Sequence, residues 1–502
     1  MNIKNFTPRP YQISIIETCK NKNTLVCVPT GLGKTKIAIL LAIEELNKYP
    51  ETKALILTPT KPLANQICNE FKECTDINPN EIVLLTGFIS PKKRIDMYNI
   101  SKVIVATPQT IEKDVTNNRI SLNEFSLLVI DEAHRSRERF ANTIVAKYYI
   151  EQAKYKRILA LTASPGSTKS KIEEVCKNLY IEAIEIRTEK DEDISEFIQS
   201  KNTEYINVEL PEEIKFLHSL IKGFYKEKLE GLRNFNINKP TSQINKVDIL
   251  FLQRRLQNSS KNSAVFYGLS LVAQLLKLNF AMELIETQGI NSLNDFFKKL
   301  ELEETKAAKI ILKNQNILKA RMLCEQLLEK SVNHPKINKL KEIIKETLEN
   351  KKDSRIIIFA TYRNTVDNIM NLLNRIGIKT TRLVGQKEGL SQKEQIETIK
   401  NFNDGVYNCL VATSIAEEGL HIEEADVAIF YDNTPSSIRK IQRAGRVGRL
   451  KPGRIIFMIT KGTRDSAYYW KSKKDEIRMK SILYGMKEQT KKEFKEKQLT
   501  DF

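Results

Sequence analysis

Short runs of apolar and β-branched residues alternate with longer stretches of helical periodicity along the first third of the chain. A strand buried in a parallel sheet is continuously apolar, whereas a crossover helix is apolar on one face only. The pattern predicts strands at TLVCV (24–28), ALILT (54–58), EIVLL (81–85), KVIVAT (102–107), LLVID (127–131) and RILALT (157–162). Helical segments such as 34–48 and 60–72 separate these runs. Strand, crossover helix and strand in succession are typical of a doubly wound α/β sheet.

The alternation stops at about residue 200 and resumes after about residue 330. In between, stretches such as PEEIKFLHSLIKGFYKEKLEGL have apolar residues at helical spacing, which predicts an all-α region. Further strands are predicted at RIIIFA (355–360), TTRLV (380–384), NCLVAT (408–413), DVAIFY (426–431) and RIIFMIT (454–460). The polar, basic stretch that follows is predicted to be helical. The expected organisation is α/β: one parallel-sheet domain (1–200), an all-α insert (201–330), a second parallel-sheet domain (331–465) and a basic helical tail (466–502).

Length and composition narrow the class of protein. A chain of 502 residues is long enough for about three domains. No apolar run of about 18 residues is visible, so no membrane span is expected, and the first residues lack the apolar region of a secretory signal. The seven cysteines form no CxxC pair, which argues against a zinc site or a disulfide framework. A cytoplasmic location is the expectation.

The net charge of +19 favours a polyanionic partner such as nucleic acid. A general lysine-rich composition is the alternative, so the charge needs support from motifs.

The stretch VPTGLGKT (28–35) nearly fits the phosphate-binding loop G-x-x-x-x-G-K-[ST], with Val28 in place of the first glycine. It follows a predicted strand and opens a predicted helix, which is the setting that such a loop requires. Lys34 would reach the β- and γ-phosphates of a nucleotide, and the Thr35 hydroxyl would hold Mg²⁺. A glycine turn that happens to precede a lysine is the alternative. The candidate nucleotide-binding residues here are Val28, Pro29, Thr30, Gly31, Leu32, Gly33, Lys34 and Thr35.

The segment LLVIDEAHRS (127–136) ends a predicted strand in two acids. Asp131, at the carboxyl edge of a parallel sheet beside the phosphate loop, can hold Mg²⁺, and Glu132 can deprotonate the attacking water. Solvated acids at a strand end are the alternative. His134 is a candidate for coupling the ATP site to the second α/β domain. Thr162 and Ser164 of LTASPG (161–166) offer hydroxyls that can bond the two acids.

The second α/β region contains QRAGRVGR (442–449). Arg446 and Arg449 are candidate arginine fingers for the γ-phosphate, which would place the ATP site in a cleft between the two domains. Closure of that cleft on ATP would be the motor stroke. A solvated basic helix face is the alternative.

Taken together, the motifs resemble those of superfamily-2 helicases, in the same order along the chain. They are RPYQ (9–12), PTGLGKT (29–35), TPTKPLANQ (58–66), LLTG (84–87), VATPQT (105–110), DEAH (131–134), TAS (162–164), IFATYR (358–363), VATSIAEEGL (411–420) and QRAGRVGR (442–449). HPK (334–336), PSSIRKIQRAGRVGR (435–449) and RDSAYYWKSKKDEI (464–477) make the chain similar to the archaeal Hef helicases and their FANCM and Mph1 relatives. The resemblance implies two RecA-like domains, ATP and Mg²⁺ as cofactors, and an insert that binds branched DNA.

The resemblance also assigns roles to individual residues. Gln12 would contact adenine, Gly419 would belong to the nucleotide site, and Gln442 would approach the γ-phosphate with the two arginines. A nucleic-acid path would be lined by Thr60, Gln66, Thr107, Pro108, Thr361, Arg363 and Thr413. Such contacts go to phosphates and have no sequence preference.

Two features depart from the family pattern. His421 stands where relatives have an aspartate after the EEGL motif, which puts one detail of coupling in doubt. No XPF-like nuclease motif is present, so DNA cleavage is not expected; a separate nuclease or a sliding clamp stays open as a partner.

The expected function is that of an archaeal ATP-dependent DNA helicase or translocase, acting on forks and junctions in DNA repair. One alternative is an RNA helicase or duplex-RNA translocase of the RIG-I and Dicer type. The other is a non-catalytic scaffold, which would be expected to have lost Lys34, Glu132 or Arg446; the chain retains all three.

Overall fold

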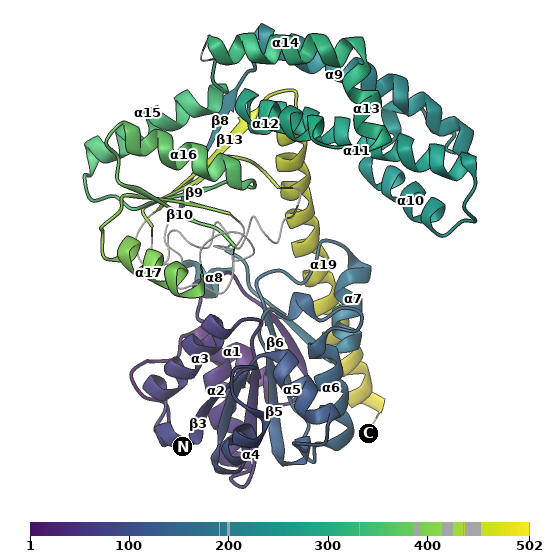
Figure 1. Cartoon of the computed structure of the whole chain (residues 1–502). Helices are drawn as coiled ribbons and strands as arrows, with labels where there is room; N and C mark the ends of the chain where they lie inside the picture. The colour runs from purple at the N-terminus through teal and green to yellow at the C-terminus, as the bar shows by residue number, and fades with distance from the viewer. Residues whose placement is uncertain are drawn as a thin grey trace.

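A computed structural model describes residues 1–189, 191–197, 201–330, 332–385, 391–413, 425–434, 436 and 453–500 of the chain. Two parallel β-sheets, each with helices on both faces, lie one beyond the other (Figure 1). A bundle of helices extends from the second sheet domain, on the side away from the first. The long helix α19 runs from the second domain down along the first. The α/β class and the all-α bundle predicted from the sequence are confirmed.

The first sheet has seven parallel strands within the described residues, in the order β3-β4-β2-β5-β6-β1-β7. The strands are β1 (Thr24–Cys27), β2 (Lys53–Leu57), β3 (Ile82–Leu85), β4 (Val103–Ala106), β5 (Phe125–Ile130), β6 (Ile158–Thr162) and β7 (Ala183–Ile186). The six strands predicted in this region all form, each within about two residues of its expected bounds. The edge strand β7 was not predicted.

Helices cover both faces of this sheet. They are α1 (Pro10–Cys19), α2 (Lys34–Lys48), α3 (Lys61–Cys74), α4 (Pro91–Ile100), α5 (Pro108–Thr116), α6 (Ala141–Gln152), α7 (Lys169–Asn178) and α8 (Glu192–Ser195). Short 3₁₀ turns are η1 (Pro79–Glu81), η2 (Leu122–Glu124) and η3 (Ala133–Arg135). Prolines begin α1, α4 and α5, where the fixed φ and the missing N–H suit the first helical turn.

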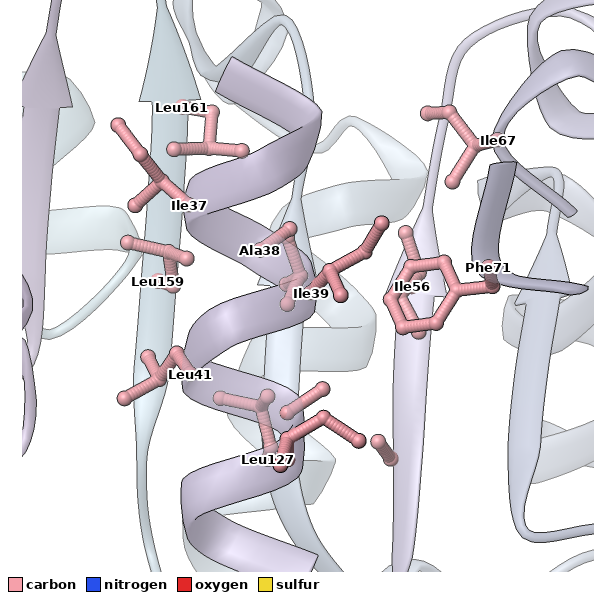
Figure 2. Close-up of a cluster of buried hydrophobic side chains, with 14 of the residues drawn as sticks. Ile37, Ala38, Ile39, Leu41, Ile56, Ile67, Phe71, Leu127, Leu159 and Leu161 are labelled. Carbon is pink, nitrogen blue, oxygen red and sulfur yellow. The ribbon is translucent and has the colours of Figure 1, made fainter. Parts of the chain in front are cut away.

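Alternate residues of each strand point into two separate cores. Ala54 and Ile56 of β2 pack on the face covered by α1, α2 and α3, whereas Leu55 and Leu57 pack on the face covered by α5, α6 and α7. Figure 2 shows the first of these cores, with Ile37 and Leu41 of α2 beside the strands. Burial of both faces explains why the strands are continuously apolar in the sequence.

The second sheet has six parallel strands within the described residues, in the order β10-β11-β9-β12-β13-β8. The strands are β8 (Lys201–Val208), β9 (Ile356–Phe359), β10 (Thr380–Leu383), β11 (Cys409–Ala412), β12 (Val427–Phe430) and β13 (Gly453–Thr460). Helices α15 (Pro335–Asn350), α16 (Arg363–Arg375) and α17 (Gln392–Asn403) pack on it. All five strands predicted here form. The sheet also contains β8, from a segment expected to be helical.

Strand β8 changes the expected entry to the helical region. Its residues pair in parallel with β13, from Lys201 with Gly453 to Val208 with Thr460. The chain therefore contributes an edge strand to the second sheet before the helices begin at Glu212. It returns to the same domain at Pro335. The helical bundle is thus joined at both ends to the second domain.

The bundle consists of α9 (Glu212–Glu230), η4 (Gly231–Phe235), η5 (Thr241–Gln243), α10 (Lys246–Gln257), α11 (Ser263–Thr287), α12 (Ile290–Glu301), α13 (Lys306–Lys313) and α14 (Gln315–Glu329). The central helix α11 is long and apolar enough to cross a membrane, by length and composition only. In the structure α11 is the core helix of the bundle and packs against α9, α10, α12 and α13. Its apolar character is therefore accounted for by burial within the bundle.

The last element, α19 (Arg464–Thr500), agrees with the predicted helical tail in type. The helix begins in the second domain and extends along the first domain. Met479 and Leu483 are buried in the core of the first domain, on the face of α5, α6 and α7.

Candidate functional site

The predicted site residues of the first domain lie along one edge of the sheet. The parallel strands all present their carboxyl ends there, and a ligand site in an open α/β sheet forms at that edge. The phosphate loop follows β1, Asp131 follows β5, and Thr162 ends β6. Thr60 follows β2 and Thr107 follows β4. Because the strand order is β4-β2-β5-β6-β1, the predicted nucleic-acid residues lie on one side of the DEAH strand and the nucleotide residues on the other.

The loop between β1 and α2 has the backbone shape of a phosphate cradle. Gly31 and Gly33 both have positive φ, 87° and 67°, which side chains other than glycine adopt at a cost. A Cβ on Gly33 would also lie 2.8 Å from the side-chain amide of Gln12. Lys34 starts α2, and its Nζ donates to the Val28 carbonyl at 3.4 Å across the loop. The loop therefore has N–H groups, a helix N-terminus and a lysine at one point, as phosphate binding requires.

The start of α1 supports this loop from behind. The Tyr11 hydroxyl, fully buried, donates to the Leu32 carbonyl at 2.6 Å. Gln12 accepts from the Arg9 N–H at 2.9 Å, and its amide nitrogen lies 3.5 Å from the Gly33 carbonyl. Gln12 therefore contacts the phosphate loop, and its role towards adenine stays a prediction. Tyr11 is a supporting residue that the sequence motif includes but that the residue-by-residue prediction missed.

The two acids after β5 differ in their surroundings. Burial, together with the neighbouring charge of Glu132, raises the pKa of Asp131 to about 7, and Lys34 partly offsets this. Burial acts in the same direction on Glu132, but hydrogen bonding and charge from His134 lower the pKa of Glu132 overall. Glu132 also has a φ of 50°, a rare conformation for a non-glycine residue and one that clusters at functional sites. His134 therefore favours the ionised form of Glu132. Asp131, in contrast, needs a neighbouring cation to favour its ionised form.

The need of Asp131 for a neighbouring cation provides a test of whether Mg²⁺ fits this site. Within the described part of the chain, no group of three metal-ligating side chains is present. Mg²⁺ keeps several water ligands and binds through one or two protein oxygens together with substrate phosphates. Asp131 and the Thr35 hydroxyl are oxygen donors of this kind, so the site fits Mg²⁺ with bound nucleotide.

The predicted coupling residues form a chain of contacts that differs from the expectation. His134 Nδ1 lies 3.2 Å from Glu132 Oε2 and 3.3 Å from the Thr162 hydroxyl. The Thr162 hydroxyl also accepts from the Ser164 N–H at 3.1 Å. Thr162 was expected to bond the acids directly, but His134 stands between them. The Ser164 hydroxyl donates to Met479 Sδ of α19 at 2.9 Å instead of to an acid.

The predicted nucleic-acid residues of the first domain start helices. Thr60 is the N-cap of α3 and accepts from the Leu63 N–H at 3.5 Å. Thr107 precedes α5, and its hydroxyl lies 2.8 Å from that of Thr110, while the following Pro108 is buried. Gln66 is half-buried on α3. The N–H groups of two helix starts thus lie near these residues, which suits phosphate contacts.

In the second domain, Thr361 follows β9 and Thr413 follows the neighbouring strand β11. The Thr361 N–H donates to Asp432 Oδ2 at 2.9 Å, and its hydroxyl donates to Asp432 Oδ1. Gln288, at the end of α11, donates to the same carboxylate at 3.0 Å. Thr413 is buried, and Arg363 begins α16. Asp432 and Gln288 were not predicted, because only the fold brings the end of the insert to the carboxyl edge of the second sheet.

Other predicted residues lie outside the described residues: Gly419, Gln442, Arg446 and Arg449, and the departure at His421. Their roles stay predictions.

Glu132→Gln is expected to lower the turnover number of ATP hydrolysis at least about 100-fold, because an amide cannot accept the proton of water. ATP binding should persist, since the loop and Lys34 are unchanged. Steady-state hydrolysis and binding of a fluorescent ATP analogue would measure the two effects. Glu138→Gln, an exposed glutamate in the following loop, is the matched control and should hydrolyse ATP normally. Comparable turnover in both variants would exclude Glu132 as the base.

Matches to known protein families extend over almost the whole chain. Residues 9–172 match the family model DEAD/DEAH box helicase, and residues 335–451 match helicase conserved C-terminal domain. Residues 213–331 match the helical bundle of a family described as putative ATP-dependent RNA helicase.

Individual proteins are similar over the same span. The crystal structure of the Hef helicase domain from Pyrococcus furiosus is 43% identical, with a TM-score of 0.72, over 92% of this chain and 98% of that one. A putative ATP-dependent RNA helicase of Methanocaldococcus jannaschii, MJ1505, is 41% identical over 96% of this chain. The ATP-dependent DNA helicase mph1 of Neurospora crassa is 33% identical over 92% of this chain. The chain spans 61% and 41% of the lengths of these two relatives.

Proposed function

The chain belongs to the superfamily-2 helicases, in the group of Hef, FANCM and Mph1, and from this premise we propose that it is an ATP-dependent DNA helicase or translocase. It hydrolyses ATP, with Mg²⁺ as cofactor, to unwind or remodel branched DNA such as replication forks and junctions. A cytoplasmic role in DNA repair, in an archaeal cell, belongs to the same proposal. A separate nuclease or a sliding clamp would be a further partner.

The observation that supports this function is the order of the strands at the carboxyl edge of the first sheet. The DEAH strand β5 has the nucleotide loop on one side, beyond β6, and the helix starts of Thr60 and Thr107 on the other. The sheet therefore holds the nucleotide site and a phosphate-binding surface in a fixed relation, so a domain movement driven by hydrolysis moves both together. That is the arrangement a motor on a nucleic-acid backbone needs.

In this mechanism each residue acts on charge or on a proton. Lys34 and the N–H groups of the loop bind the β- and γ-phosphates. Thr35 and Asp131 would hold Mg²⁺, which neutralises phosphate charge when bound. Glu132, kept ionised beside His134, accepts the proton of the attacking water. Arg446 and Arg449 stabilise the charge of the γ-phosphate from the second domain and so link hydrolysis to domain closure.

The parts of the chain have separate roles in the proposal. Residues 1–200 bind ATP, residues 331–465 supply the arginines, and the 201–330 insert and the 466–502 tail act on DNA and on domain position. The insert is fixed to the second domain through Gln288 and Asp432, so it moves with Thr361. An insert placed in this way can set which branch of a DNA junction the motor engages.

An RNA substrate is the second candidate function. It is favoured by the match of residues 213–331 to a helical bundle described as that of a putative RNA helicase. The phosphate contacts proposed here do not distinguish RNA from DNA. A non-catalytic scaffold is disfavoured, since the chain retains the phosphate loop with Lys34 and both acids, Asp131 and Glu132.

The ATPase rate with different nucleic acids tests the proposal. Rates are measured without nucleic acid and with single-stranded DNA, duplex DNA, a model fork and matched RNAs, with Lys34→Ala as the blank. The strongest stimulation is expected from forked DNA. Stimulation mainly by duplex RNA would move the chain to the RNA function with the same motor, and the absence of stimulation by any of them would overturn both.

A further inference from the structure

Helix α19 is anchored firmly in the second domain at its start. Asp465 is fully buried and accepts from Lys336 Nζ at 2.6 Å and from the Thr460 N–H at 2.9 Å. One turn later, Tyr469 is buried in the core of the second sheet. Arg464 reaches the insert, where its N–H donates to Glu286 at 2.8 Å. This end of α19 therefore moves with the second domain and the insert.

The same helix is anchored a second time in the first domain (Figure 1). Met479 and Leu483 are buried among the residues that cover the sheet beside β7. The Tyr484 hydroxyl lies 3.0 Å from that of Thr188, and Lys487 Nζ lies 2.8 Å from Glu185 Oε2. Glu185 is itself buried, so loss of Lys487 would leave this carboxylate without one of its compensating cations.

Between the two anchors α19 is more exposed than at either of them, although Lys473 still lies over the Tyr205 ring of β8 at 5.7 Å. Residues 474, 477 and 478 are exposed and the other residues of 473–478 are partly buried, and Ile477 is 62% exposed. An α-helix rises about 1.5 Å per residue, so Asp465 and Met479 lie about 21 Å apart along the axis. A helix does not stretch, so relative motion of the two domains must bend this span or shift Met479 on the first domain.

Met479 contacts the predicted coupling residues, so a shift of α19 on the first domain would displace them. The Ser164 hydroxyl donates to Met479 Sδ at 2.9 Å, and the Ser164 N–H donates to the Thr162 hydroxyl at 3.1 Å. Thr162 contacts His134, and His134 contacts Glu132. A continuous series of contacts, none longer than 3.3 Å, thus joins α19 to the proposed catalytic base.

We propose that Met479 is a positioning residue that transmits the position of the second domain to Glu132, through Ser164, Thr162 and His134. When nucleic acid and ATP draw the domains together, α19 presses or turns at Met479 and sets the orientation of His134 and Glu132. The inference rests on the proposed function, because it concerns the stimulation of the ATPase by nucleic acid. It adds a route to the ATP site that does not pass through the interdomain cleft.

The test compares Met479→Ala with Ile477→Ala, an exposed apolar residue on the same helix. The measured quantities are the ATPase turnover number and KM for ATP, with and without the nucleic acid that stimulates the wild type best. In Met479→Ala the basal rate and KM should stay within about two-fold of wild type. The stimulated turnover number should fall at least about five-fold, the lower end of ordinary coupling between sites. Ile477→Ala should be stimulated like wild type.

Two further variants separate positioning from simple packing. Met479→Leu keeps most of the side-chain volume but removes the sulfur that accepts from the Ser164 hydroxyl. Stimulation should therefore stay low in this variant, whereas recovery to the wild-type level would show simple packing and overturn the inference. Ser164→Ala should lose stimulation, and combining it with Met479→Ala should add little, because both act on one contact. If Met479→Ala does not fold, the double variant Tyr484→Phe, Lys487→Gln loosens the same anchor without a cavity and should lower stimulation at least about two-fold.

The outcomes are distinct. A folded Met479→Ala, or the loosened double variant, with wild-type stimulation would overturn the inference and leave the proposed function intact. A wild-type chain that no nucleic acid stimulates would overturn the proposed function, and the inference with it.

Discussion

Lys34→Ala is expected to lower ATP hydrolysis at least about 100-fold, the effect of removing one well-placed charged donor from a transition state. Lys34 is the first residue of α2, and its Nζ already lies within the loop, 3.4 Å from the Val28 carbonyl. The loop would keep its N–H groups but lose the cation that offsets phosphate charge. Steady-state phosphate release with saturating nucleic acid measures the loss.

Nucleic-acid binding should survive this change, because Thr60 and Thr107 lie on the other side of β5. Filter binding of a labelled fork at fixed salt would compare the variant with wild type. Lys36→Ala is the matched control: this lysine is on the same helix, but its Nζ pairs with Glu70 at 3.0 Å on α3. Near-normal turnover in Lys34→Ala, or equal losses in both variants, would show that VPTGLGKT is not the phosphate loop.

The predicted strands, and the predicted positions of the loop and Asp131 at strand ends, have a common reason for their accuracy. Buried parallel strands must be apolar on both faces, so β1, β2 and β5 stand out as continuous runs. Asp131 and the loop were placed correctly at strand ends, because the carboxyl edge of a parallel sheet is fixed by strand direction alone. Local sequence is enough to predict an element or a residue position when the physical constraint on it, such as burial on both faces, is local.

The strands that the sequence missed are edge strands with polar residues. β7 (AIEI) contains Glu185, a buried carboxylate that pairs with Lys487 and Arg187 and accepts from the Thr18 hydroxyl. β8 (KNTEYINV) begins with four polar residues and lies at one edge of the described sheet, where it pairs with β13. Both strands form because of partners far away in the chain. No pattern within these segments indicates those partners.

The same limit applies to the site. Gln288 and Asp432 meet across 144 positions of sequence, and Ser164 meets Met479 across 315. Neither Gln288 nor Met479 has a chemical signal of its own, because a glutamine at a helix end and a methionine on a helix are ordinary residues. The fold alone gives them a relation to the predicted site.

The HPK motif illustrates what the structure adds to a sequence resemblance. Lys336 is fully buried, and its Nζ donates at 2.6 Å both to Asp465 Oδ2 and to the Tyr431 carbonyl. Asp465 also accepts from the N–H groups of Asn433 and Thr460. One carboxylate thus ties together the starts of α15 and α19 and the ends of β12 and β13. The lysine is structural, and it holds the base of the helix that reaches the first domain.

Lys336→Met keeps most of the side-chain volume but leaves the Asp465 carboxylate buried without a cation. Breaking a buried pair in this way costs about 3–5 kcal/mol, so the thermal midpoint of the second domain should fall by roughly 10 °C. Differential scanning calorimetry would measure the shift. Lys339→Met removes a lysine from the same helix, where Nζ pairs with Glu342 at 2.7 Å on the surface, and should shift the midpoint by about 2 °C or less.

A second variant separates the charge from the hydrogen bonds. Adding Asp465→Asn to Lys336→Met removes the uncompensated charge, while the asparagine oxygen can still accept from the Thr460 and Asn433 N–H groups. The double variant should therefore recover part of the lost midpoint. If Lys336→Met behaves like Lys339→Met, the buried pair does not form, and the rigid base of α19 on which the coupling through Met479 depends is absent.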